Sequence, residues 1–378
     1  MAYAIDFSAV LEAQERLNRP VMWSVHRTRV ARSDELDQLA GRELFFKCEN
    51  EQRGGAFKIR GAMNAIICLD DEDKAWAWGG VCTHSSGNHA LAVALAAKVR
   101  GVDAHIVMPK SASKFKVDKV ERQGAVITFC EPDLKSREDA VAHVIKDTYA
   151  TFVHPYDNPN VIAGQGTAAL EFMQQVEHPE AYGGHKQWFE KDVIPGEFDA
   201  LITPVGGGGL LAGTCIAARA TQPNCRLFGA EPTGADDAAL SLAAGELIPQ
   251  DCPDTICDGL LTSLGELTWP ILRDHLESIV TVTDDEVVEA MRLLHEHLDM
   301  VVEPSGAIPL AAVLSDQFRA LHGIERVGLI LSGGNIDPDW LRNLLLRRKR
   351  WRKAFARARR MLRRQRWREA FARARRTP

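Results

Sequence analysis

Short apolar runs alternate with amphipathic stretches along most of this chain. Three such runs lie at Val81–Thr83, Ala104–Met108 and Val126–Phe129, and their length is typical of buried strands. Between them, Asn88–Lys98 and Lys114–Gln123 repeat their apolar positions at helical spacing. Strands that alternate with helices predict a parallel, doubly wound α/β sheet.

The alternation continues on both sides of this segment. Further strands are predicted at Glu43–Cys48, Thr151–Val153, Ala200–Thr203, Arg226–Ala230 and Val327–Leu331. Further helices are predicted at Phe7–Leu17, Asp34–Leu39, Ile59–Ile67, Ser136–Tyr149, Gly166–Val176, Leu210–Thr221, Asp284–His297 and Pro304–Leu321. We predict a large domain from residues 1–79 and 161–346, a small domain inserted at 80–160, and a C-terminal tail at 347–378.

One connection interrupts the alternation of strands and helices. Glu177–Phe198 is longer than connections in compact domains usually are. We interpret it as a surface loop to which the sequence assigns no role.

Composition agrees with a soluble protein. Hydrophobic residues make up 46% of the chain and charged residues 26%, which is ordinary for globular domains. No apolar run approaches the roughly 20 residues of a membrane-spanning helix, and the N-terminus lacks a secretory pattern. Eight cysteines occur without a CxxC pair, which favours reduced thiols and a cytoplasmic location.

The first chemically marked stretch is Glu51–Ala62, with Lys58 between Phe57 and Ile59. An ammonium in such surroundings is poorly solvated, so its pKa can fall and the amine can act as a nucleophile. Taken alone, a Lys near glycines is more often a solvated surface residue.

A second marked stretch is the run of four glycines at 206–209, between a predicted strand and a predicted helix. Backbone amides that lead into a helix N-terminus bind phosphate. Because dinucleotides and nucleotides use similar loops, this run indicates only a phosphate.

Four motifs in order carry a family resemblance. They are FFKCENEQRGGAFKIRGA, THSSGNHA at Thr83–Ala90, PVGGGGLLAG at Pro204–Gly213 and LSGGN at Leu331–Asn335. Together they resemble fold-type II pyridoxal-phosphate enzymes, in the branch of serine racemase and the serine, threonine and 3-hydroxyaspartate dehydratases. The resemblance covers Leu36 to Asn335 and implies two doubly wound parallel-sheet lobes with the cofactor between them.

The resemblance assigns pyridoxal 5'-phosphate to a set of residues. Lys58 would hold it covalently, and the other contacts would come from Phe57, Asn88, Gly206, Gly207, Gly208, Gly209 and Ser332. In this branch Asn88 corresponds to the residue bonded to the cofactor's 3′-oxygen. Ser332 corresponds to the one facing the pyridine nitrogen, where a hydroxyl leaves the ring largely unprotonated. Without the other motifs, Ser332 would be a simple turn residue.

A substrate carboxylate would bind at the start of the helix at Asn88. The implied residues are Ser85, Ser86, Gly87 and His89, which can also cap that helix. Ser86 corresponds to the serine that, in serine racemase, exchanges a proton with Cα on the face opposite the lysine. The catalytic residues implied are therefore Lys58 and Ser86.

Three further positions match the substrate side of the resembling enzymes. Arg137 can pair with a second carboxylate, although the SRED sequence around it is equally an ordinary capped, charged first turn. Asp258 and Thr262 complete the set.

The stretch AEPTGADDA resembles a divalent-cation site. Glu231, Asp237 and the carbonyl of Ala235 would supply hard oxygen ligands for Mg²⁺, Ca²⁺ or Mn²⁺. Loop carboxylates of this kind are otherwise usually just solvated.

The tail is strongly basic. From Arg347 onward, sixteen Lys and Arg residues stand against one Glu, so the tail carries +15 within a chain of net charge −5. Arg350–Leu362 and Arg366–Pro378 are near-copies. Such a tail can contact nucleic acid, an anionic membrane or an acidic neighbouring subunit, or have no selected role.

We predict a cytoplasmic ammonia-lyase, expected as a homodimer, that converts serine, threonine or 3-hydroxyaspartate to a 2-oxo acid and ammonia. FFKCEN and the HPYDNP stretch at His154 favour the dehydratases. The alternatives are a serine or aspartate racemase that uses Lys58 and Ser86, and a regulator that only senses an amino acid. The retention of Lys58 and Ser332 weighs against the regulator.

Overall fold

A computed structural model describes residues 3–19, 25–72, 76–182 and 195–342. The chain divides into two units, Met1–Asn335 and Ile336–Pro378. The basic tail predicted at 347–378 lies outside the described residues. Within the described residues, no helix combines the length and the apolar character that crossing a membrane requires.

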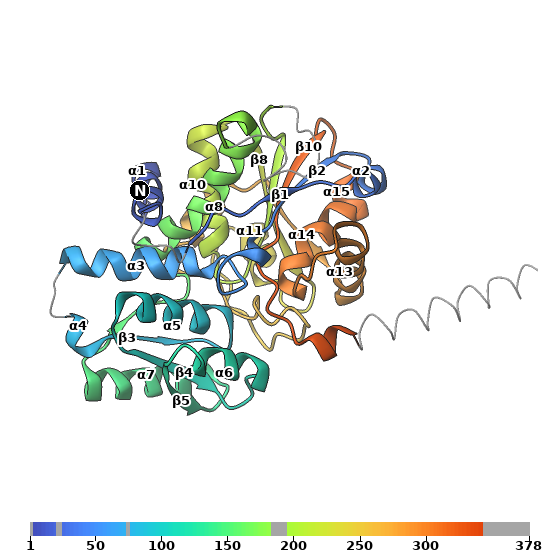
Figure 1. Cartoon of the computed structure of the whole chain (residues 1–378). Helices are drawn as coiled ribbons and strands as arrows, with labels where there is room; N and C mark the ends of the chain where they lie inside the picture. The colour runs from blue at the N-terminus through green and yellow to red at the C-terminus, as the bar shows by residue number, and fades with distance from the viewer. Residues whose placement is uncertain (1–2, 20–24, 73–75, 183–194, 343–378) are drawn as a thin grey trace, which may run out of the picture. The chain divides into compact units, whose positions relative to one another are not determined.

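The first unit contains two sheets (Figure 1). The larger one has the strand order β1-β2-β10-β7-β8-β9, and its neighbours run parallel except for the antiparallel edge pair β1 and β2. Its strands are β1 (Val30–Ala31), β2 (Glu43–Lys47), β7 (Ala200–Pro204), β8 (Arg226–Pro232), β9 (Ser278–Val282) and β10 (Arg326–Ile330). We call this sheet and its helices the large lobe.

The smaller sheet is entirely parallel, in the order β5-β4-β3-β6. Its strands are β3 (Val81–His84), β4 (Ala104–Pro109), β5 (Val126–Cys130) and β6 (Thr151–Phe152). With its helices it forms the small lobe. Two such sheets confirm the predicted α/β class with parallel sheets.

Helices flank both sheets (Figure 1). They are α1 (Phe7–Leu17), α2 (Asp34–Ala40), α3 (Lys58–Glu72), α4 (Trp76–Gly79), α5 (Asn88–Arg100), α6 (Lys114–Glu121), α7 (Leu134–Thr148), α8 (Pro159–Glu177), α10 (Gly209–Thr221), α11 (Asp237–Ala244), α12 (Trp269–His275), α13 (Asp284–Leu298), α14 (Pro304–Leu314) and α15 (Asp316–Arg319). Short 3₁₀ turns occupy Glu49–Glu51 and Pro179–Tyr182.

Helix α3 continues to Glu72, beyond its predicted end at Ile67. Two other predicted helix boundaries are wrong because of a capping residue. α8 begins at Pro159, before the predicted start at Gly166, because the Asn158 side chain accepts the Val161 amide at 3.0 Å. The helix predicted at Pro304–Leu321 is two helices, because Ser315 caps the second one by accepting the Phe318 amide. The edge strands β1 and β9 were not predicted.

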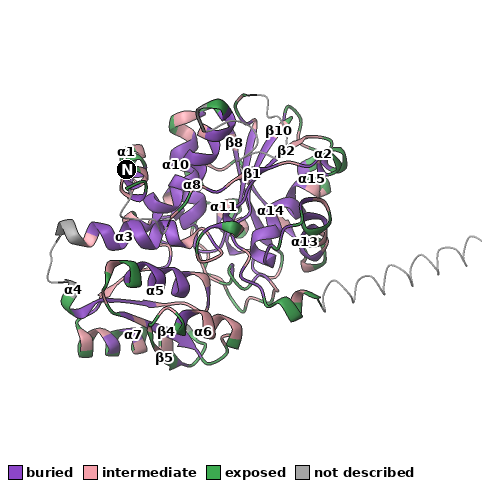
Figure 2. Cartoon of the chain, viewed as in Figure 1, coloured by how far each residue is buried: buried purple, intermediate pink, exposed green. Residues whose placement is uncertain are grey.

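Helix α8 lies at the centre of the large lobe and is buried along most of its length (Figure 2). Paired glycines let its neighbours approach closely. A Cβ on Gly164 would lie 2.7 Å from the Cα of Gly61 in α3, and a Cβ on Gly213 of α10 would lie 2.5 Å from the amide nitrogen of Gly166. The same helix therefore holds α3, which begins with Lys58, and α10, which begins with Gly209.

Seven of the eight cysteines are buried, and all eight are free thiols, as the sequence predicted. The connection Glu177–Phe198 includes the 3₁₀ turn at Pro179–Tyr182, and its residues 183–194 lie outside the described part.

Candidate active site

Residues from both lobes line one cavity. It brings together most of the predicted site residues, namely Phe57, Lys58, Ser86, Gly87, Asn88, His89, Gly206, Gly207, Gly208, Gly209, Asp258, Thr262 and Ser332. Residues that were not predicted as site residues also line it, among them Lys116, Tyr156, Glu303 and Ser305. Tyr156 belongs to the HPYDNP stretch noted above, the other three belong to no recognised motif, and only the folded chain places all four here.

Lys58 is the first residue of α3, and its side chain reaches into the cavity. Its Nζ donates a hydrogen bond to the Pro155 carbonyl oxygen at 2.8 Å. Burial lowers its pKa to about 8. Burial, together with the positive charge of Lys58, also lowers the pKa of nearby His154 to about 4, so that imidazole is neutral. Lys58 thus has a carbonyl partner, and burial is the cause that lowers its pKa.

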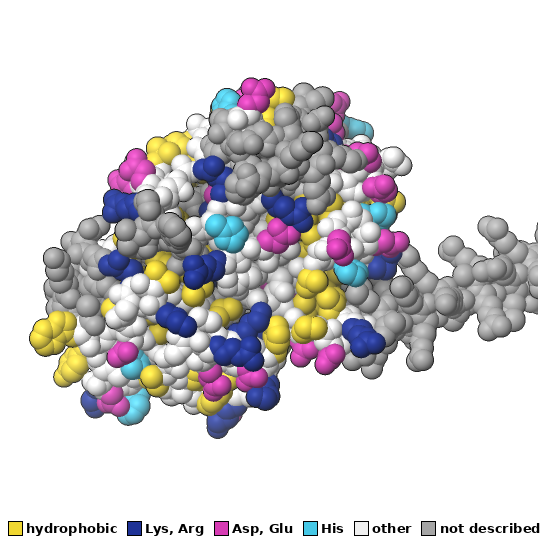
Figure 3. All heavy atoms as spheres, in the orientation of Figure 1, with side chains coloured by type: hydrophobic (Ala, Val, Ile, Leu, Met, Phe, Trp, Pro, Cys, Tyr) yellow, Lys and Arg dark blue, Asp and Glu magenta, His cyan; other side chains and the backbone are white. Residues whose placement is uncertain are grey.

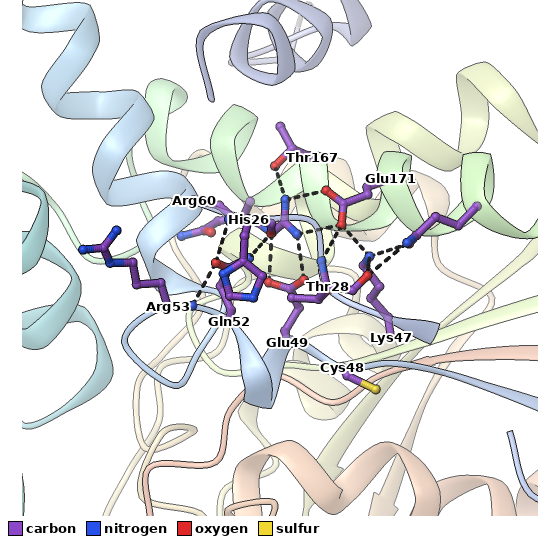
Figure 4. A network of polar contacts seen from close by, with 12 residues as sticks. His26, Thr28, Lys47, Cys48, Glu49, Gln52, Arg53, Arg60, Thr167 and Glu171 are labelled. Atoms are coloured by element: carbon purple, nitrogen blue, oxygen red, sulfur yellow. Dashed lines mark hydrogen bonds and ion pairs between the residues drawn. The ribbon is translucent and has the colours of Figure 1, made fainter. Parts of the chain in front are cut away.

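A network of buried charges joins the first turn of α3 to α8 and to the end of β2 (Figure 4). The Arg60 guanidinium donates to Glu49 at 2.8 Å and to Glu171 of α8 at 3.2 Å. Lys47 donates to the same Glu171 at 2.6 Å. Burial disfavours the Glu171 carboxylate, but attraction to Arg60 and Lys47 outweighs it and lowers the Glu171 pKa to about 2. Removal of one partner would leave a buried charge uncompensated, so the network ties this turn to α8.

The loop Gly206–Gly208 needs glycine for steric reasons. Gly208 has φ +88°, and a Cβ on Gly207 would lie 2.3 Å from the Tyr156 ring. The Gly207 carbonyl oxygen accepts a hydrogen bond from the Thr268 hydroxyl at 2.8 Å. The loop ends at the first turn of α10, whose amides lack partners within the helix. This arrangement suits a phosphate group.

A chain of hydrogen bonds orients Asn88. Asn335 Nδ2 donates to Asn88 Oδ1 at 2.9 Å, and Asn88 Nδ2 donates to Glu303 Oε1 at 2.6 Å. Burial raises the Glu303 pKa to about 7, and its Oε2 has no hydrogen-bond partner among the described residues. The Asn88 side chain is therefore fixed at the cavity, and because its amide nitrogen carries two N–H groups, one remains for a ligand oxygen.

Ser332 follows β10 and lies beside the Lys58 segment. Its carbonyl accepts the Phe57 amide at 3.0 Å, and Gly334 donates to the Gly55 carbonyl at 2.8 Å. A Cβ on Gly333 would lie 2.2 Å from Glu303 Oε1. The two glycines after Ser332 therefore allow the segment to pass between Gly55–Phe57 and Glu303.

The predicted carboxylate-binding turn is only partly in the cavity. Ser86, Gly87 and His89 line it, whereas Ser85 does not, and its Oγ accepts the Gly87 amide at 3.2 Å. His89 is buried, with Nε2 3.2 Å from the Val153 carbonyl and Nδ1 without a partner among the described residues.

Arg137 lies outside the set of residues that line the cavity. It is half-buried on α7, and its Nε has no hydrogen-bond partner in the described part of the chain. Asp258 does line the cavity, where it forms an ion pair with Lys116 of α6.

Glu231 and Asp237 are not among the residues that line this cavity, and they lie at the end of β8 and the start of α11. Glu231 accepts the amides of Ala238 and Ala239 at 3.1 and 2.9 Å. Burial raises the pKa of Glu231 to about 8 and that of Asp237 to about 6. Asp237 Oδ1 is buried without a partner among the described residues. The third predicted ligand residue, Ala235, is also buried. No cluster of three or more His, Cys, Asp or Glu residues suited to a metal occurs among the described residues.

The chain is similar to known proteins over most of its length. Residues 23–333 match the family described as pyridoxal-phosphate dependent enzyme. The chain is 45% identical to serine racemase from Arabidopsis thaliana over 338 residues, which cover 89% of this chain and 94% of the relative. It is also 45% identical to β-hydroxyaspartate dehydratase from Paracoccus denitrificans over 339 residues, which cover 90% of this chain and 99% of the relative.

Among solved structures, maize serine racemase is similar with a TM-score of 0.81 and 44% identity, covering 93% of this chain and 100% of that one. These findings confirm the resemblance stated from the motifs, and with it the fold. The chain belongs to the pyridoxal-phosphate dependent enzyme family.

Proposed function

We propose that this protein is an ammonia-lyase that converts a small β-hydroxy amino acid to a 2-oxo acid and ammonia. The observation that carries the proposal is the shared cavity, in which the low-pKa amine of Lys58 lies with the glycine loop, Asn88 and Ser332. The similarity to β-hydroxyaspartate dehydratase supports the same reaction class.

The residues present fit pyridoxal phosphate. The glycine loop at the start of α10, where a Cβ on Gly207 would collide with the Tyr156 ring, would hold the phosphate. Asn88, fixed by Asn335 and Glu303, has an N–H for the 3′-oxygen. Lys58 would hold the cofactor, with Phe57 beside its ring and Ser332 at its ring nitrogen. When bound, the cofactor supplies an electron sink that acidifies the substrate Cα–H.

The chain's own groups supply the rest of the chemistry. Lys58, free to accept a proton because burial lowers its pKa, takes the proton from substrate Cα as general base. The turn Ser86–His89 at the start of α5 holds the substrate carboxylate. Asp258 and Thr262 line the substrate side of the cavity. Loss of the β-hydroxyl and subsequent hydrolysis give pyruvate and ammonia from serine, or oxaloacetate and ammonia from 3-hydroxyaspartate.

Racemisation is the second candidate function. Ser86 lines the same cavity as Lys58, and its hydroxyl would return a proton to the other face of Cα. The similarity to serine racemases supports this reading. The two activities differ in whether Cα is reprotonated before the β-hydroxyl leaves.

The first test is an assay of the purified protein with pyridoxal phosphate and Mg²⁺. The substrates are L- and D-serine, L-threonine and the diastereomers of 3-hydroxyaspartate, and 2-oxo acid and enantiomer are followed together. Oxo acid ahead of inverted amino acid supports the lyase, and the reverse order supports the racemase. Neither product with cofactor bound would refute both.

Replacement of Lys58 tests the cofactor assignment. Lys58→Ala removes the amine that would hold the cofactor, so we expect loss of the visible absorbance of lysine-bound pyridoxal phosphate and of both activities. Lys114→Ala, on the exposed side of α6, is the matched control and should keep the absorbance. An unchanged spectrum in Lys58→Ala would place the cofactor on another residue.

We further propose that Glu231, Asp237 and the Ala235 carbonyl bind Mg²⁺, Ca²⁺ or Mn²⁺. The support is chemical, because two buried carboxylates with raised pKa values and an unpartnered oxygen favour a hard cation. We also propose a cytoplasmic homodimer, on the support of eight free thiols for the compartment.

A further inference from the structure

Lys116 is a cation of the small lobe at the edge of the candidate active site. It belongs to α6, and its side chain is 13% exposed. Among the described residues that line the cavity, Lys58 and Lys116 are the Lys and Arg side chains. Figure 3 shows Lys and Arg side chains gathered on the face of the molecule near α6, where the small lobe meets the large one.

The Lys116 ammonium lies directly against the predicted carboxylate-binding turn. A Cβ on Gly87 would be 3.2 Å from Lys116 Nζ and 3.1 Å from its Cδ. Glycine at position 87 therefore leaves space that the Lys116 side chain occupies. A ligand whose first carboxylate bound at Ser86–His89 would therefore lie beside this ammonium.

The present partner of Lys116 is a carboxylate that a ligand can replace. Lys116 Nζ pairs with Asp258 Oδ2 of the large lobe, and the Asp258 side chain is 51% exposed. An ion pair with one partner in solvent is weak. The other acidic group that lines the cavity, Glu303, accepts a hydrogen bond from Asn88. Asp258 is the carboxylate that forms the ion pair with Lys116.

We propose that Lys116 binds the second carboxylate of a dicarboxylic β-hydroxy amino acid, and that Asp258 holds its ammonium in the ligand-free protein. The inference rests on the proposed function and names its substrate class. It differs from the resemblance, which assigned the second carboxylate to Arg137. Arg137 is absent from the described residues that line the cavity, whereas Lys116 is present.

The test compares two substrates in the cofactor-saturated, full-length enzyme. Lys116→Met should lower the ratio of kcat/KM for 3-hydroxyaspartate over that for L-serine by about tenfold to a hundredfold, the range for hydrogen bonds to charged groups. Lys116→Arg should restore part of the ratio. Lys114→Met, which removes an ion pair within the same helix, is the control and should leave the ratio unchanged.

A binding measurement needs no turnover. Succinate has two carboxylates, and butyrate has a methyl group in place of one. Calorimetry on the holoenzyme should show tighter binding of succinate than of butyrate, and Lys116→Met should remove most of that difference. Asp258→Asn frees the ammonium, so we expect it to tighten succinate binding.

Two results would overturn the inference. One is an equal loss for both substrates and both ligands in Lys116→Met, which would place Lys116 at the first carboxylate. The other is a loss of the preference in Arg137→Met alone, which would return the role to Arg137. If the wild type turns over neither substrate, the proposed function fails, and the comparison of succinate with butyrate still decides whether Lys116 binds a second carboxylate.

Discussion

The reactivity of a single amine depends on its immediate surroundings, and Lys58 shows how. Burial lowers its pKa to about 8, and its bond partner is a carbonyl oxygen, which gives a weaker hold on the charge than a carboxylate would. At pH 7 about 10% of such amines are neutral, against about 0.03% of ordinary lysines. That difference is what a nucleophile and general base requires.

In the cofactor-free protein, Lys58 should therefore react with acetic anhydride in a pH-dependent way. Only the neutral amine is acylated, so the rate should rise with pH and reach half its maximum at about pH 8. Lys114, whose pKa is raised by its bond to Asp118, should reach its midpoint at a higher pH. Trace labelling read peptide by peptide in a mass spectrometer measures both. Coincident midpoints would contradict the lowered pKa.

At the scale of elements, α8 acts as the common support of the two helices that begin at the cavity. Its glycines bring α3 and α10 close, and its Glu171 binds Arg60 and Lys47. Contacts with α8 thereby position both the start of α3 and the start of α10. Their first residues, Lys58 and Gly209, line the same cavity as a result.

Gly164→Ala tests this support. The new Cβ would lie 2.6 Å from the Arg60 carbonyl and 2.7 Å from the Gly61 Cα, so α3 must move. We expect a loss of about 1–3 kcal/mol in unfolding free energy, together with weaker retention of pyridoxal phosphate. Urea unfolding and cofactor titration measure these effects.

Gly196→Ala is the matched control, because among the described residues the atoms nearest to its Cβ would be those of the Arg326 guanidinium, at the ordinary contact distance of 3.4 Å. It should change neither quantity appreciably. Equal effects of the two substitutions would show that the close crossing of α3 and α8 is not what positions Lys58.

At the scale of the whole first unit, the proposed cation site should link ion binding to global stability. The carboxylates of Glu231 and Asp237 are buried close to one another, and each is costly to charge without a cation. A cation bound only by the folded state stabilises it by mass action, about 2.7 kcal/mol at a hundredfold excess over Kd.

Addition of Mg²⁺ to protein treated with a chelator should therefore raise the Tm. Glu231→Gln and Asp237→Asn should abolish the rise, whereas Asp236→Asn, a neighbouring carboxylate outside the proposed ligand set, should retain it. Scanning calorimetry with and without Mg²⁺ gives the comparison. A rise that survives Glu231→Gln would locate the ion elsewhere.

The local pattern of the sequence determined most of the elements and the family. Helix α1 matches its prediction at both ends, and the strands of the small sheet lie within a residue or two of the predicted runs, because periodicity and turn residues are local signals. Lys58, Asn88, the glycine loop and Ser332 were named from motifs, since each motif carries its chemistry within a few consecutive residues.

Only the tertiary structure decided what meets across the two lobes. Glu303 beside Asn88 and Tyr156 over Gly207 join residues far apart in the chain, and Lys116 meets Gly87 within the small lobe. No spacing in the sequence encodes those meetings, because they depend on how helices cross and how two sheets are placed. For the same reason motif comparison named Arg137 as the partner of a second carboxylate, whereas the fold brings Lys116 into the cavity.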